Sequence, residues 1–199
     1  EQHNFSPASV QHAPGLYIAA APGSDLPGWG TGEVDLGLRM MSLTSWLDLL
    51  LKCKIKHVVC LMDAEELEKR YGGLGDGTLE ATCRSQGLSF RHVQVPEGGW
   101  PLPSAAAEAL STLKGLPAPL SAESAVVICS SGRGPSATVA AAWLHLLSDL
   151  DAEAAARTVE QAAKEVACSR EPLGAFDGNA EAFTDFVSAA LGLVEYVET

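Results

Sequence analysis

Short apolar runs alternate along this chain with longer segments in which apolar residues recur every three or four positions. The runs of strand length cover residues 16–20, 57–61, 89–95 and 125–128. The three- and four-residue spacing is typical of amphipathic helices. It predicts helices over residues 42–54, 64–71, 77–86, 104–114, 137–147, 151–166 and 179–193. Because strands alternate with helices, we predict an α/β fold with a mostly parallel central sheet flanked by helices.

The first residues differ from the rest of the chain. Residues 1–14 contain Gln, Asn and Pro without periodicity, so we predict an irregular N-terminal arm there. Residues 15–199 contain no internal repeat, no low-complexity tract and no sign of a second domain. A chain of 199 residues is of the size that builds one core. We therefore predict a single domain over residues 15–199.

The net charge of the chain argues against nucleic acid and anionic membranes as partners. The net charge is −12, and a strongly acidic protein repels the phosphates of nucleic acid and of anionic membranes. No apolar run reaches the roughly 18–20 residues that span a bilayer. We expect a soluble protein whose partners are proteins, with neither nucleic acid binding nor membrane insertion.

The five cysteines lie at irregular spacings, without a Cys-x-x-Cys pair or a Cys/His metal pattern. An odd, unpatterned set of this kind predicts free thiols and neither a metal site nor a cofactor. Cys53, Cys60 and Cys83 lie in apolar surroundings and are predicted to be buried. Free thiols favour an intracellular reducing compartment, the cytoplasm.

The segment from Cys129 to Ser136, with the sequence CSSGRGPS, carries the most chemistry. It follows the apolar run 125–128 and precedes the helix predicted for 137–147. Backbone N–H groups of a Gly-rich loop at a helix N-terminus bind anions, and the same field favours the thiolate form of a cysteine. We predict an anion-binding loop with Cys129 at its base. The loop residues are Ser130, Ser131, Gly132, Arg133 and Gly134.

This loop resembles that of the cysteine-dependent protein phosphatases, whose pattern is His-Cys, five residues, Arg, and then Ser or Thr. Cys129 and Ser136 match that pattern, and Gly132 and Gly134 are where the family has glycines. The position of the family's phosphate-binding Arg is Pro135, and the position of its His is Ile128.

A second landmark lies about thirty residues upstream of Cys129. Residues 97–101, Glu-Gly-Gly-Trp-Pro, are similar to the Asp-Gly-Gly-x-Pro loop that carries the general acid in the dual-specificity branch of this family. The resemblance extends from about residue 16 to residue 193 and is strongest to the kinase-associated phosphatase type. It implies a dual-specificity phosphatase-like sandwich, with Glu97 at the position of the acid.

The resemblance also implies a mechanism that this sequence lacks in part. Cys129 stands at the attacking thiolate, Glu97 at the proton donor and Ser136 at the hydroxyl that helps the thiolate leave. Pro135 supplies no guanidinium and removes one backbone N–H. Losing a bidentate charged pair, at roughly 1.5–3 kcal/mol for each hydrogen bond, costs about 10²–10⁴ in rate. We therefore predict a pseudophosphatase that acts as a binding module or as a scaffold subunit of a larger assembly.

The sequence leaves two alternatives open and argues against a third. An active phosphatase requires Arg133 to turn inward in place of the missing Arg, with Glu97 as its acid. A redox-sensitive thiol protein requires an exposed and reactive Cys129. Sulfur transfer of the rhodanese type is disfavoured, because its cysteine loop has a different size.

Overall fold

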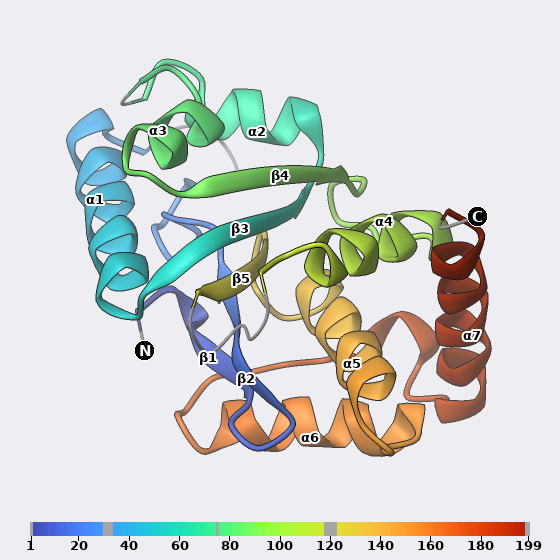
Figure 1. Ribbon diagram of the computed structural model, residues 1–199. Coiled ribbons are helices and arrows are strands. Elements are labelled where there is room, and N and C mark those ends of the chain that lie inside the picture. Colours follow the sequence, from blue (N-terminus) through green and yellow to red (C-terminus); the bar gives the residue numbers. More distant parts are fainter. Residues whose placement is uncertain (1, 30–33, 75, 118–122, 198–199) are drawn as a thin grey trace.

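The computed structural model describes residues 2–29, 34–74, 76–117 and 123–197, and a five-stranded sheet forms the centre of this part of the chain (Figure 1). The strands are β1 (Ser6–Ser9), β2 (Ala13–Ala20), β3 (Ile55–Met62), β4 (Ser89–Gln94) and β5 (Ser124–Cys129). Their order is β1-β2-β5-β3-β4. Only β1 runs antiparallel to its neighbour, and the other paired strands are parallel. The predicted mostly parallel α/β sheet is confirmed.

Helices cover both faces of the sheet (Figure 1). One face carries α1 (Leu36–Lys52), α2 (Ala64–Tyr71) and α3 (Leu79–Ser85). The other carries α4 (Pro103–Lys114), α5 (Pro135–Leu147), α6 (Ala152–Lys164) and α7 (Ala180–Val197). Successive residues of β5 point to opposite faces of the sheet. Val126 and Ile128 pack on the side of α1–α3, and Val127 and Cys129 pack on the side of α4–α7.

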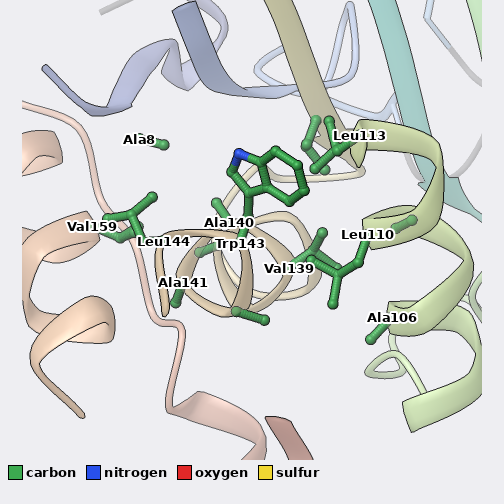
Figure 2. Close-up of a cluster of buried hydrophobic side chains, with 14 of the residues drawn as sticks. Ala8, Ala106, Leu110, Leu113, Val139, Ala140, Ala141, Trp143, Leu144 and Val159 are labelled. Carbon is green, nitrogen blue, oxygen red and sulfur yellow. The ribbon is translucent and has the colours of Figure 1, made fainter. Parts of the chain in front are cut away.

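Helix α5 is the most buried helix of its layer, and its packing fixes the loop that precedes it. Figure 2 shows Val139 and Trp143 of α5 facing Leu110 and Leu113 of α4, with Leu144 on the side of α6. Alanines fill much of the remaining surface of α5 and are fully buried, so neighbouring elements approach closely. A helix held on several sides gives the Cys129 loop a rigid support.

The N-terminal segment is not an irregular arm, and that prediction is wrong. Residues Ser6–Ser9 form β1, which pairs antiparallel with β2, and β2 already begins at Ala13. The sequence Ser-Pro-Ala-Ser has no apolar run to reveal a strand. Its Pro is tolerated because β1 is an edge strand. Residue 1 lies outside the described residues, as do 198–199 at the other end of the predicted domain.

Three helices begin earlier than the apolar spacing predicts, and α4 does so by only one residue, at Pro103. Helix α1 begins at Leu36 instead of residue 42, because the Asp35 side chain accepts hydrogen bonds from the N–H groups of Gly37 and Leu38. Helix α5 begins at Pro135 instead of residue 137, because Pro suits the first turn of a helix.

The described cysteines are all free thiols. Cys60 and Cys83 are buried as predicted, and burial raises the pKa of Cys83 to about 12 and that of Cys60 well above its usual range. Cys53 is only half-buried, which corrects the prediction for it, because it caps the exposed end of α1. Among the described helices, none combines the length and the apolar character needed to cross a bilayer.

Candidate functional site

A cavity of about 220 Å³ lies where the carboxyl ends of the parallel strands β3, β4 and β5 meet. Its walls come from Leu61 and Glu66, from the loop after β4, from the loop after β5, and from Glu171. Ligands of open α/β sheets bind at this edge. The two landmark loops identified in the sequence therefore line the same cavity.

Cys129 is the last residue of β5 and forms part of the cavity wall, although its side chain is only 2% exposed. Its Sγ lies 3.2 Å from the Oγ of Ser136, which is fully buried in the first turn of α5. The structure thus brings together the thiol and the hydroxyl that the sequence pattern placed seven residues apart.

Neighbouring segments hold the loop between Cys129 and α5 by donating hydrogen bonds to its carbonyl groups. A backbone nest for an anion needs its carbonyls turned away from the ligand. Three carbonyls of this loop bond to surrounding segments. They belong to Cys129, Ser131 and Arg133, and they accept hydrogen bonds from Ala21 N, Asn4 Nδ2 and Glu171 N, each at 2.9 Å.

Two glycines of the loop are required by close contacts. Gly132 has φ +70°, and a Cβ there would lie 2.6 Å from the backbone of Ala19 and Ala20. A Cβ on Gly134 would lie 2.6 Å from the Trp100 ring, and one on Gly174 would lie 2.7 Å from the same ring. The Trp100 ring therefore packs between Gly134 and Gly174 and holds the loop after β4 against the Cys129 loop.

The two departures from the phosphatase pattern occupy well-packed positions. Pro135 is the first residue of α5 and lines the cavity, so the wall has an apolar ring where the pattern has a guanidinium. Ile128 is fully buried in the opposite face of the sheet from Cys129. It provides no hydrogen-bonding group near the thiol.

Arg133 also lines the cavity. Its side chain is exposed, and it makes no ion pair within the described part of the chain. Its backbone N–H donates to Ser131 Oγ at 3.3 Å. The remaining loop residues Ser130, Ser131 and Gly134 are part of the same wall.

Glu97 lies on the loop after β4, at the same edge of the sheet as Cys129, but its carboxylate does not form part of the cavity wall. The side chain is 55% exposed, and Oε1 accepts a hydrogen bond from Arg70 Nη2 at 3.3 Å. Its neighbours Pro96, Gly98 and Gly99 line the cavity in its place. The structure thus brings the acid-like loop to the site while directing the carboxylate toward Arg70.

Arg70 and Glu66 of α2 are site residues that the sequence interpretation missed. Arg70 Nη1 donates to Ser130 Oγ at 2.8 Å, which joins α2 to the Cys129 loop. Its Nη2 lies 2.6 Å from Glu66 Oε1, an ion pair without the alignment of a hydrogen bond. A Glu and an Arg four residues apart usually indicate a solvated helix face. The signal was their position directly after the carboxyl end of β3, and both side chains are in fact more than nine-tenths buried.

A second buried arginine, Arg170, supports the Cys129 loop indirectly, through Asn4. The residue is 5% exposed, and its guanidinium donates to the carbonyls of Asn4, Ile18 and Ser169 and to Ser6 Oγ. Burial lowers its pKa to about 10, which leaves it charged at neutral pH. Asn4 in turn donates to the carbonyl of Ser131, so the N-terminal segment supports the loop directly.

The cavity wall therefore offers a buried thiol, two serine hydroxyls, backbone groups, the Arg133 guanidinium and the carboxylates of Glu66 and Glu171. The Arg70 guanidinium lies behind this wall, bonded to the wall residue Ser130. No cluster of three or more His, Cys, Asp or Glu side chains that could hold a metal ion occurs within the described ranges.

No protein-family model and no curated protein matches the sequence. Solved structures do match it over nearly its whole length. Kinase-associated phosphatase, with its catalytic-site cysteine replaced by serine, is 19% identical, with a TM-score of 0.65 over 95% of this chain and 98% of that chain.

Two other phosphatase structures match at similar coverage. PTPMT1 in complex with PI(5)P is 16% identical, with a TM-score of 0.58 over 94% of this chain and 97% of that one. Tk-PTP in the active form is 15% identical, with a TM-score of 0.55 over 90% and 97%. The chain thus has the fold of the dual-specificity and tyrosine phosphatases.

Proposed function

We propose that this protein is a catalytically silent form of the phosphatase fold, a pseudophosphatase that acts as a binding or scaffold subunit among protein partners. The observation that carries the proposal is Pro135, which fills the cavity wall immediately before Ser136. Phosphoryl transfer relies on a fixed guanidinium that stabilises charge in the transition state. A pyrrolidine ring at this position cannot supply it.

The orientation of Glu97 supports the same proposal. A general acid must place its proton within hydrogen-bond reach of the leaving oxygen. Glu97 instead accepts a hydrogen bond from Arg70 and lies outside the cavity wall. Both the charge stabilisation and the protonation of the leaving group are therefore weakened.

The intact cavity favours a binding role over a purely vestigial one. The Cys129 loop is held by contacts to β2, Asn4 and Glu171, and Gly132 fits tightly against the backbone of β2. The net charge of −12 favours protein partners over nucleic acid. The free cysteines are consistent with a reducing compartment such as the cytoplasm.

Hydrolysis of an aryl phosphate by the purified protein tests the proposal. The protein and its Cys129→Ser variant are compared at equal concentration. We expect the two to release phosphate at the same background rate. A rate that is clearly higher for the unaltered protein would contradict the proposal.

An active phosphatase is the second candidate, and the position of Arg133 favours it. This guanidinium lines the cavity and has no ion-pair partner among the described residues. If the protein is active, Arg133→Gln should abolish the Cys129-dependent rate in the same assay. An unchanged rate in Arg133→Gln would show that Arg133 does not replace the missing group.

A further inference from the structure

Arg70 is a guanidinium already fixed beside the cavity. Its side chain is only 9% exposed, and Nη1 donates to Ser130 Oγ, a hydroxyl on a residue of the cavity wall. Arg133, by comparison, is exposed and its guanidinium makes no ion pair in the described part of the chain. A guanidinium that is already ordered loses less conformational freedom when it binds a ligand.

Two carboxylates share one nitrogen of this guanidinium. Nη2 lies 2.6 Å from Glu66 Oε1 and 3.3 Å from Glu97 Oε1. The three ionised side chains together carry one excess negative charge. Glu66 is 3% exposed and needs Arg70 as its counterion, because a buried unpaired carboxylate is costly. Glu97 is 55% exposed, so water can solvate it when it leaves Arg70.

The chain beside Glu97 can accommodate such a movement. Gly98 has φ +68°, and no other atom lies within 4 Å of where its Cβ would be. Trp100 anchors the loop two residues further on, between Gly134 and Gly174. Gly98 therefore has open space on its Cβ side, next to the anchor at Trp100.

We propose that Arg70 is the guanidinium that binds a tetrahedral oxyanion at this cavity, and that Glu97 occupies Arg70 until such an anion displaces it. Carboxylate and phosphate oxygens are interchangeable partners of a guanidinium. The proposal rests on the binding role proposed above and identifies its ligand as a phosphate group, either free or carried by a phosphorylated side chain. During this exchange Nη1 of Arg70 remains bonded to Ser130 Oγ, which holds the guanidinium beside the loop.

Removing the competing carboxylate is the first test. Binding of inorganic phosphate and of a phosphotyrosine peptide is measured by titration calorimetry at fixed ionic strength. Because an exposed ion pair is weak, Glu97→Gln should bind about 2- to 5-fold more tightly than the unaltered protein. The matched control is Glu108→Gln, which removes the same charge from an exposed pair with Arg91 that does not line the cavity. The probe that binds more tightly identifies the source of the phosphate group.

Replacing the guanidinium is the second test. Arg70→Lys keeps the positive charge beside Glu66 but loses the forked donor geometry, and it should bind at least about 10-fold more weakly. Arg91→Gln should bind as the unaltered protein does. A cooperative thermal unfolding transition is required of Arg70→Lys, to establish that the variant is folded. The test with Glu97→Gln is independent of the stability of Arg70→Lys.

Three outcomes would overturn the proposal. They are equal affinities of Glu97→Gln and Glu108→Gln, unchanged affinity in Arg70→Lys, and no phosphate binding by Glu97→Gln. Release of phosphate from the bound peptide is a separate outcome. It would contradict the catalytically silent function while leaving the assignment of Arg70 intact.

Discussion

Gly132 lies where the Cys129 loop passes closest to β2, and its hydrogen side chain lets the loop fit there. The backbone of Ala19 and Ala20 occupies the space that a Cβ would need, and backbone cannot move aside as a side chain can. The loop therefore depends on this residue for its shape, independently of any chemistry at Cys129.

Gly132→Ala should lower the free energy of unfolding by about 2–4 kcal/mol. The added Cβ would overlap the backbone of Ala19 and Ala20, and alanine is strained at the φ of +70°. Gly87→Ala is the matched control, because φ there is +75° and no other atom lies within 4 Å of a Cβ. It should cost about 1 kcal/mol. Urea denaturation of both variants measures the difference. Equal losses would show that the contact with β2 is not close.

His3 makes the N-terminal segment sensitive to pH. The residue is 2% exposed, and neither ring nitrogen has a hydrogen-bond partner among the described residues. Burial lowers the pKa of His3 below 6.5, and the nearby charge of Asp25 opposes this only in part. The unfolded chain therefore takes up a proton first as pH falls.

The stability that neutral His3 contributes is full above pH 6.5 and is lost as pH falls through 6.5 toward the lower folded-state pKa. The Tm of the protein should therefore fall more between pH 7 and pH 5 than the Tm of His3→Asn, a replacement that tolerates the φ of 62°. Differential scanning calorimetry at several pH values measures this. Parallel pH profiles would rule out His3 as the source.

The junction between β5 and α5 explains how the fold accepts Pro135. A proline at the first position of a helix removes an N–H that has no partner within the helix, and its fixed φ suits the first turn. The helix thus begins normally while the cavity loses its guanidinium. At the level of the element, Pro135 leaves the start of α5 intact, and the proposed loss of catalysis arises only from the missing guanidinium.

Pro135→Arg alone should therefore gain phosphate or vanadate binding but little turnover. Ile128 and Glu97 would remain, and general acid catalysis alone is worth about 10²–10⁴. The triple variant Ile128→His, Pro135→Arg, Glu97→Asp should recover far more than the sum of its single changes, since groups that act as one unit are not additive. Phosphate binding and aryl phosphate turnover are measured for Pro135→Arg and for the triple variant. Full activity in Pro135→Arg alone would show that the other two losses matter little.

The elements differ in how far their sequence reveals them. The buried strands β3 and β5 and the helix after Cys129 follow from apolar pattern alone. β1 does not, because it lacks an apolar run and its buried Ser6 hydroxyl is satisfied by Arg170 from far along the chain. Cys129, Ser136 and the position of the Glu97 loop follow from motif spacing. Arg70 does not, because only the packing of α2 turns a common charge spacing into a buried contact with Ser130.

Across the whole molecule, Arg170 joins the first strands to the Cys129 loop. It bonds to Asn4 and Ser6 at the start of the chain and to Ile18 in β2. Arg170→Met should lower the free energy of unfolding by about 2–4 kcal/mol, because several buried acceptors lose their donor. Hydrogen exchange should accelerate in β1 and the Cys129 loop before it does in α4. Uniform exchange in all three would contradict this coupling.

We propose above that the molecule binds a phosphate group without hydrolysing it. A single-turnover experiment tests it most directly, with the protein in excess over a phosphotyrosine peptide. Bound peptide and released phosphate are measured in the same samples, beside Cys129→Ser. We expect bound, intact peptide and no phosphate release above that of the variant. Release that depends on Cys129 would contradict it.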